Sequence, residues 1–128
     1  MTDKKLTILL VDDDRFLLDM YVMKFQKSGM EIDSASNGTE ALTKLRAGSS
    51  YDIILLDIIM PGIDGLELLK TIKEEKLLPN AVCIMLTNQA EDSEKAKAMG
   101  VDGYIVKATS IPSEVVEQVL NIYKSKQK

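Results

Sequence analysis

The sequence predicts an α/β protein with a flavodoxin-like fold. Five short apolar runs alternate along the chain with five segments whose apolar residues have helical spacing. This alternation requires a parallel sheet with helices on both faces. Right-handed crossovers between five strands favour the strand order 2-1-3-4-5. We therefore expect one domain over residues 1–128, with its core at about 6–123 and a polar tail at 124–128 that frays.

The expected strands are the five apolar runs. The central run, Ile53–Leu56, shows no polar alternation, which is typical of a strand that is covered on both faces. The other four expected strands are Leu6–Val11, Met30–Ala35, Ala81–Leu86 and Gly103–Val106.

Start and stop signals predict the helices together with the apolar spacing. The first is expected over Arg15–Gly29 and the second from its cap, Asn37, to about Ala47. A helix over Ala90–Met99 has few large apolar residues and should pack lightly. The remaining two are expected from near Gly65 to before Leu78-Pro79, and from Pro112 onward.

Composition excludes several classes of function. The net charge of −4 and the pI near 4.9 argue against direct binding of nucleic acid, which needs a basic surface. The absence of histidine removes Ser-His and Cys-His catalysis and every His-ligated metal site. The single Cys83 cannot form an internal disulfide, and no signal peptide or membrane span is evident. We therefore predict a soluble protein of the cytoplasm that does not bind membranes.

Polar residues follow four of the expected strands at the point where each strand ends. Asp12 and Asp13 follow the first strand, and Asp57 follows the third. Thr87 follows the fourth strand and Lys107 the fifth. Because the carboxyl ends of parallel strands meet at one edge of the sheet, this edge should gather three carboxylates, a hydroxyl and an ammonium group.

Such an edge suits a metal ion and a phosphoryl group. A divalent cation relieves the repulsion between the carboxylates, and oxygen ligands without Cys or His select Mg²⁺, with Mn²⁺ also possible. The metal and Lys107 would neutralise phosphoryl oxygens while Thr87 donates a hydrogen bond. An aspartate after a strand can also be a simple strand stop. We expect Asp57 to be a nucleophile because it faces the acidic pair and precedes the Met60-Pro61-Gly62 turn.

This pattern resembles the receiver domain of two-component response regulators, from Leu6 to about Tyr123. The matching residues are Asp12-Asp13 after LLV, Asp57 in DIILLD followed by MPGIDG, Thr87 after IML, and Tyr104 and Lys107 in GYIVK. The resemblance implies that the chain is a signalling phosphoacceptor and not an enzyme. Such a domain would assist its own phosphorylation and dephosphorylation. Asp57 would take a phosphoryl group from a sensor histidine kinase, from a phosphotransfer protein or from a small phosphodonor.

The resemblance also implies roles for the other residues. Asp13, Asp57 and the backbone carbonyl of Ile59 would hold Mg²⁺ directly, with Asp12 helping through water. Thr87 and Lys107 would hold the phosphoryl oxygens.

Tyr104 would turn inward when Thr87 moves. This motion would change the surface of the fourth helix, fifth strand and fifth helix, where a downstream protein binds. The chain would act as a monomer or as a phosphorylation-dependent dimer.

The sequence departs from the family pattern after Lys107, and two variable positions near the site also bear on its chemistry. The pair Lys107-Ala108 stands where the family usually has proline after the lysine. A cis bond before Ala is disfavoured by about 3–4 kcal/mol, against about 0.5–1 kcal/mol before Pro, so we predict a trans bond. The variable positions are occupied by Ile59 and Gln89, and Ile59 places an apolar side chain where a hydrolytic water would approach.

Two alternative functions are compatible with parts of the pattern. Asp12-x-Asp14 after a strand resembles the nucleophile motif of metal-dependent phosphatases of haloacid-dehalogenase type. That motif has a small hydroxyl residue where this chain has Phe16. The other alternative is an interaction module on the same fold that cannot be phosphorylated.

Overall fold

The computed structural model describes residues 5–58, 60–87, 93–107 and 111–126. Strands and helices alternate in it as predicted. The strands are β1 (Thr7–Val11), β2 (Glu31–Ala35), β3 (Ile53–Leu56), β4 (Val82–Thr87) and β5 (Gly103–Val106). The helices are α1 (Arg15–Lys27), α2 (Gly38–Arg46), α3 (Gly65–Glu74), α4 (Ser93–Ala98) and α5 (Pro112–Lys126).

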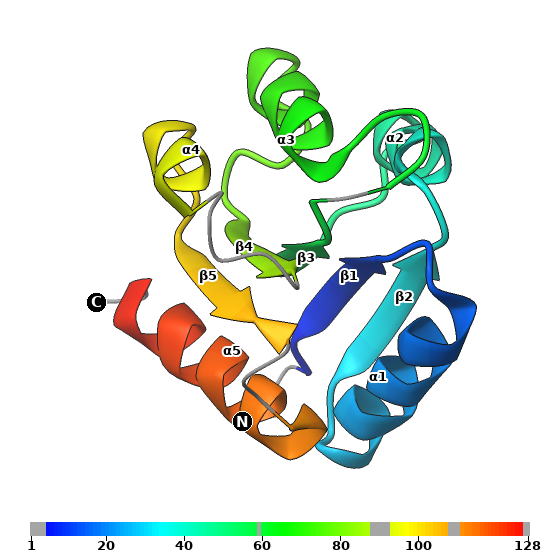
Figure 1. Cartoon of the computed structure of the whole chain (residues 1–128), viewed down its shortest axis with the longest axis vertical. Helices are drawn as coiled ribbons and strands as arrows, with labels where there is room; N and C mark the ends of the chain where they lie inside the picture. Colours follow the sequence, from blue (N-terminus) through cyan, green and yellow to red (C-terminus); the bar gives the residue numbers. More distant parts are fainter. Residues whose placement is uncertain (1–4, 59, 88–92, 108–110, 127–128) are drawn as a thin grey trace.

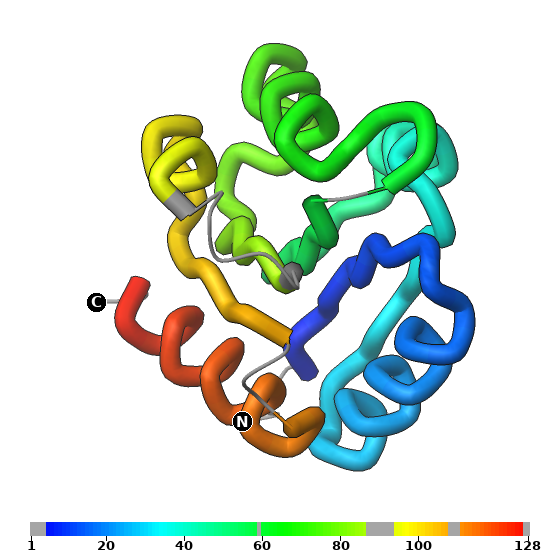
Figure 2. Tube along the Cα trace, in the orientation of Figure 1, coloured from blue at the N-terminus to red at the C-terminus, as the bar shows by residue number. Residues whose placement is uncertain are grey.

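The strands form one parallel sheet in the order β2-β1-β3-β4-β5, which confirms the predicted order. The colours of Figure 2 show the early strand β1 between β2 and β3. In the sheet register, Val11 lies opposite Leu56, Leu56 opposite Met85, and Met85 opposite Tyr104. The carboxyl ends of β1, β3, β4 and β5 therefore lie along one edge.

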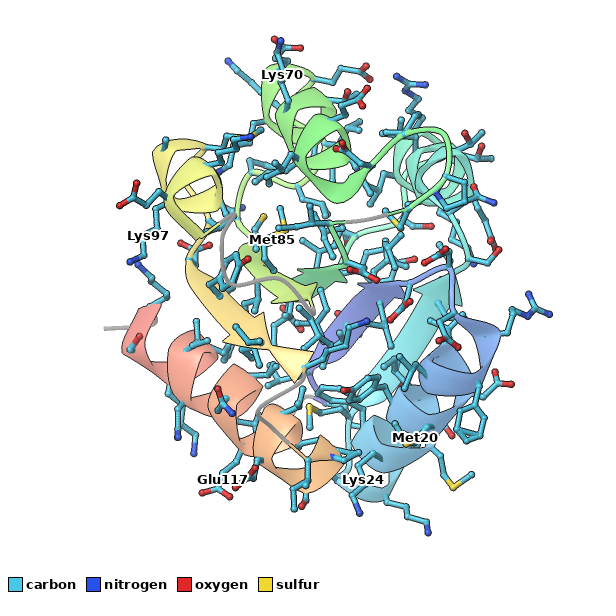
Figure 3. The ribbon with its side chains drawn as sticks, in the orientation of Figure 1. Met20, Lys24, Lys70, Met85, Lys97 and Glu117 are labelled. Atoms are coloured by element: carbon cyan, nitrogen blue, oxygen red, sulfur yellow. The ribbon has the colours of Figure 1, made fainter. Side chains whose placement is uncertain are left out.

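Helices cover both faces of the sheet. Figure 1 shows α2, α3 and α4 on one side and α1 and α5 on the other. Because successive side chains of a strand point to opposite faces, Leu9 and Val11 join the core beneath α2, α3 and α4, whereas Ile8 and Leu10 join the core beneath α1 and α5. Met85 points from β4 into the first of these layers (Figure 3). Each such side chain contributes about 1.5–3 kcal/mol when fully buried.

Capping residues fix the start of three helices near that edge. In α1, α2 and α3 the residue before the helix is Asp14, Asn37 or Asp64, and its side chain accepts a hydrogen bond from the backbone N–H three residues later. The distances are 3.2, 2.8 and 2.9 Å, respectively. A cap of this kind contributes about 1 kcal/mol. The prediction of Asn37 as a cap is therefore confirmed.

The tail that we expect to fray, residues 124–128, begins within α5, which extends to Lys126; residues 127–128 lie outside the described part. The hydroxyl of Ser125 donates to the carbonyl of Ile122 at 3.0 Å, and the ammonium of Lys126 lies 3.7 Å from the carboxylate of Asp102. Cations in the last turn also interact favourably with the helix dipole, so the lysines support the final turn.

The structure describes α4 from Ser93 to Ala98, within the predicted range Ala90–Met99, whose first residues lie outside the described part. From Glu94 to Ala98 only Ala96 is buried, as expected of a lightly packed helix. Within the described ranges, no helix has the length and apolarity needed to span a membrane.

Candidate functional site

Strand alternation brings three of the predicted site residues to the same face of the sheet. Asp12, Asp57 and Lys107 each stand two positions after a residue that is buried beneath α1 and α5: Leu10, Leu55 and Ile105. The ladder continues past the strands, since Asp12 N donates to the Ala35 carbonyl at 3.1 Å and Asp57 N to the Val11 carbonyl at 3.0 Å. Their side chains therefore meet above the core at the carboxyl edge of the sheet.

The ammonium of Lys107 joins the two aspartates. Its Nζ donates to Asp12 Oδ2 at 2.8 Å and to Asp57 Oδ2 at 3.2 Å. Asp12 is 1% exposed, and Asp57 and Lys107 are each 8% exposed. The second oxygen of Asp12 accepts a hydrogen bond from Asp14 N at 3.0 Å. Buried charges at this depth require such partners, because an isolated one is strongly disfavoured.

Asp13 completes a cluster of carboxylates. Oxygens of Asp12, Asp13 and Asp57 lie within 4.8 Å of one another, with Asp12 and Asp57 buried and Asp13 exposed. Only oxygen ligands are present among them, and they fit a hard divalent cation with an open side for water. Asp14 does not join this cluster and instead caps α1.

Three other predicted residues are described in part or not at all. Thr87 is the last residue of β4, and its backbone pairs with Val106 of β5. Tyr104 is half-buried and packs against the core beneath α2, α3 and α4. Ile59 lies outside the described residues, as do Gln89 and Ala108, so the predicted trans bond between residues 107 and 108 stays a prediction.

The charge balance of the site shifts the pKa of its groups. Burial raises the pKa of Asp57 to about 6, against the opposing charge of Lys107 and with a further contribution from Asp12. Burial also acts to lower the pKa of Lys107, but the hydrogen bond to Asp12 and the charge of Asp57 outweigh it, so that pKa is raised. Three carboxylates thus face one ammonium group, and the site is short of positive charge.

This imbalance predicts a pH-dependent stability. The folded-state pKa of Asp57, about 6, exceeds its unfolded value of roughly 3.9. Protonation of Asp57 therefore stabilises the folded protein. This stabilisation is fully present below about pH 4 and is lost as the pH rises through 6. Asp57→Asn carries no such charge. In EDTA, its Tm should exceed that of the wild type by about 4 °C or more at pH 7.5.

Thermal unfolding followed by circular dichroism from pH 4 to pH 8 measures this difference, and comparing the two proteins cancels the contributions of other titrating groups. The gap should widen between pH 4 and about pH 6 and stay constant above it. A gap that is independent of pH, or a wild type that is the more stable protein at pH 7.5, would contradict the burial of a charged Asp57.

Gly65, which the sequence predicts only as a helix start, lies against the backbone of the site. Its N–H donates to the carbonyl of Ile58 at 2.8 Å. A Cβ at this position would lie 2.1 Å from the carbonyl oxygen of Asp57, so only glycine allows α3 to pack against the backbone of Asp57. The Asp64-Gly65 pair at the end of the turn loop was the available signal.

A surface groove beside the site was not predicted. It opens next to Asp13, between the loops that follow β1, β2 and β3, and gives solvent access to the exposed carboxylate. Its lining residues are Asp13, Arg15, Ser36, Asn37, Thr39, Glu40, Pro61 and Gly62.

Comparisons with known proteins agree with this geometry. The transcriptional regulatory protein ResD of Bacillus subtilis is 41% identical over 114 residues, which cover 88% of this chain and 45% of ResD. SrrA of Staphylococcus aureus, also a transcriptional regulatory protein, is 38% identical over the same shares of both chains. The chain thus spans about half the length of the curated relatives it matches.

Solved structures show the same fold. A CheY-like receiver domain protein from Methanospirillum hungatei has a TM-score of 0.85 and 30% identity, covering 97% of this chain and 98% of its own. The response regulator TrrA of Thermotoga maritima, solved in complex with Mg²⁺-BeF, has a TM-score of 0.79 and 37% identity, covering 93% of this chain and 99% of its own. The family model of the response regulator receiver domain matches residues 8–119, and the chain therefore belongs to the receiver domains of two-component response regulators.

Proposed function

We propose that Asp57 is the phosphoacceptor of this receiver domain. The observation that carries the proposal is the buried Lys107 ammonium, held 2.8 Å from Asp12 and 3.2 Å from Asp57 at the carboxyl edge of the sheet. A carboxylate oxygen of Asp57 attacks the phosphorus atom of a phosphoryl group. That group is carried by a histidine kinase, by a phosphotransfer protein or by a small phosphodonor. The new O–P bond forms as the bond from phosphorus to the donor nitrogen or acyl oxygen breaks, and the donor leaves with that electron pair.

The carboxylate cluster supports Mg²⁺ as the cofactor, with Mn²⁺ as the alternative. Asp13 and Asp57 would hold the ion directly, together with the backbone carbonyl of Ile59, and Asp12 would help through water. When bound, the ion supplies positive charge that offsets the charge of the phosphoryl oxygens. TrrA, at 37% identity, was solved with Mg²⁺-BeF, which supports this assignment for the chain described here.

Lys107 and Thr87 would act on the phosphoryl group itself. Lys107 is already within hydrogen-bond distance of Asp57, so a small motion transfers one of its N–H donors to a phosphoryl oxygen. Thr87 ends the neighbouring strand β4, and its hydroxyl would donate a hydrogen bond to a phosphoryl oxygen. The same groups would assist loss of the phosphoryl group to water, which limits the lifetime of the signal.

The output of the domain would be a change of surface. We propose that Thr87 moves toward the phosphoryl group and that Tyr104 turns into the space it vacates, which shifts α4, β5 and α5. α4 is the lightly packed neighbour of β5, so this side of the molecule yields most readily. A downstream protein, or a second copy of the chain, would bind the surface of α4, β5 and α5 in the phosphorylated state.

Three other expectations concern nucleic acid as a partner, the location of the protein and the phosphatase alternative. Because ResD and SrrA are transcriptional regulatory proteins about twice as long as this chain, the comparisons do not support our exclusion of nucleic acid as a partner. We propose the cytoplasm as the location, since a receiver domain takes its phosphoryl group from a kinase there. The phosphatase alternative is not favoured, because both oxygens of Asp12 are engaged, by Lys107 and by Asp14 N.

Incubation with acetyl phosphate and Mg²⁺ tests the acceptor. Intact-mass spectrometry should show one added phosphoryl group that is lost in base, and Asp57→Asn should show no stable addition. In Asp13→Asn, Mg²⁺ should no longer increase the incorporation of phosphate, because a proposed ligand of the ion is lost. Asp14→Asn is the matched control, because Asn also caps helices and Asp14 lies outside the carboxylate cluster. Incorporation by Asp57→Asn equal to that of the wild type would overturn the assignment.

NMR tests the proposed switch. Beryllofluoride with Mg²⁺ should shift amide resonances of residues 93–98 and 103–106 strongly and those of α2 weakly, because α2 lies at the far end of the sheet from β5. Thr87→Ala should still accept the phosphoryl group, but should lose most of the shifts in α4. Equal shifts throughout the domain would count against a coupling that runs through Thr87 and Tyr104.

A further inference from the structure

The loop between β3 and α3 follows Asp57 directly and is in contact with the starts of two helices. At its far end, the N–H of Gly65 donates to the carbonyl of Ile58 at 2.8 Å, and α3 begins against the backbone of Asp57. The second contact is with α2, which the green segment leading into α3 passes in Figure 1. Here Ile63 lies against Gly38, the first residue of α2.

Gly38 is buried, and the space that a side chain would need there is occupied. A Cβ at this position would lie 2.9 Å from the Cβ of Ile63, 3.0 Å from its carbonyl oxygen and 3.1 Å from its Cγ2. Rotation of the Ile63 side chain would move only the last of these atoms. Glycine at position 38 therefore lets the loop approach α2 more closely than any other residue would allow.

The loop would yield to an added side chain more readily than α2. The side chain of Asn37 caps α2 with a hydrogen bond of 2.8 Å, and Ala41 in its next turn is fully buried. The loop instead includes the exposed Pro61 and Gly62, which line the groove beside Asp13. Exposed loop segments move at lower free energy than packed helices, so a side chain at position 38 would displace the loop.

We propose that Gly38 is a positioning residue for the metal-binding edge of the sheet. Because it admits Ile63, it holds the loop after Asp57 in the place that binding of Mg²⁺ requires. The loop is short, so a displacement at Ile63 reaches Asp57. A loop that is fixed against α2 also leaves α4 as the side that responds to phosphorylation, in line with the weak shifts that we expect in α2. This role rests on the proposed ligation of Mg²⁺ by Asp57.

Gly38→Ala tests the proposal. The dissociation constant for Mg²⁺, measured by isothermal titration calorimetry, should rise by about tenfold, which is typical of losing a group that orients a metal ligand. In the metal-free protein, the amide NMR resonances of Asp57 and Met60 should also shift, because the loop is displaced before any ion binds.

Gly48→Ala is the matched control at the other end of α2. Gly48 has a φ of +102°, and nothing lies within 4 Å of a Cβ added there. Alanine at this position strains the backbone and lowers stability without touching the loop. The dissociation constant for Mg²⁺ and the resonances of Asp57 and Met60 should therefore stay unchanged.

Ile63→Gly removes the same contact from the side of the loop. It should weaken binding of Mg²⁺ by itself, because the loop loses its support on α2, and it adds no atom that could disturb the folding of α2. In this background, Gly38→Ala should raise the dissociation constant by a smaller factor than in the wild type, since the two residues act through one contact.

The proposal is overturned if Gly38→Ala lowers stability but leaves the affinity for Mg²⁺ and the loop resonances unchanged. It is also overturned if Gly48→Ala weakens binding equally, or if Ile63→Gly binds Mg²⁺ like the wild type. Should Gly38→Ala fail to fold, Ile63→Gly alone decides. A wild type that binds no Mg²⁺ refutes the metal assignment, and the resonances of Asp57 and Met60 in the metal-free variants then decide whether Gly38 positions the loop.

Discussion

Replacement of Gly65 by alanine should destabilise the protein by about 3 kcal/mol and displace Asp57. The added Cβ would lie 2.1 Å from the carbonyl oxygen of Asp57, 2.8 Å from its carbonyl carbon and 2.9 Å from the Cα of Ile58. All three contacts are with backbone atoms, so no side chain can rotate away. Either the first turn of α3 must move outward or the backbone after β3 must shift, and both disturb the site.

Urea unfolding measures the loss of stability, and Mg²⁺ titration measures the damage to the site. Lys70→Ala is the control on the same helix, since Lys70 is exposed on the outer side of α3 (Figure 3). It should change the free energy of unfolding by less than about 0.5 kcal/mol. A Gly65→Ala variant as stable as Lys70→Ala, with unchanged affinity for Mg²⁺, would show that α3 does not press on Asp57.

Replacement of Lys107 by methionine should have an effect of similar size. Methionine keeps much of the length of the side chain but leaves the carboxylates of Asp12 and Asp57 buried without the cation that lies 2.8 and 3.2 Å away. Removing one partner of a buried ion pair is destabilising by about 3–5 kcal/mol. In metal-free buffer at pH 7.5, the variant should therefore lose about this much stability.

The pH dependence identifies the cause. Without Lys107, the folded-state pKa of Asp57 rises further above the unfolded value, so stability should recover as the pH falls and Asp57 takes up a proton. Adding Asp57→Asn to Lys107→Met should also restore part of the loss at pH 7.5, because one buried charge is gone. A loss that is equal at pH 5 and pH 7.5, and is not relieved in the double variant, would assign the role of Lys107 to packing instead.

Much of the fold could be predicted because local and global signals agree in this sequence. Unbroken apolar runs such as Ile53–Leu56 identify buried parallel strands, and Asn37 and Gly48 mark the ends of α2. The strand order follows from the alternation of strands and helices and from the handedness of their crossovers. The polar residues at the strand ends then assemble the cluster of Asp12, Asp13 and Asp57 without any further information.

What could not be predicted depends on contacts between residues distant in the sequence. The last turn of α5 is supported by the approach of Lys126 to Asp102, which no local pattern indicates. The need for glycine at position 65 arises from the close passage of α3 over Asp57. These features require the assembled sheet.

Location of the phosphoryl group within the chain tests the proposed function most directly. After incubation with acetyl phosphate and Mg²⁺, borohydride reduces an aspartyl phosphate to homoserine, and peptide mass spectrometry then identifies the reduced residue. We predict that reduction occurs at position 57 alone and requires both the phosphodonor and Mg²⁺. Reduction at Asp12, Asp13 or Asp14, or at no aspartate, would contradict the assignment of Asp57 as the acceptor.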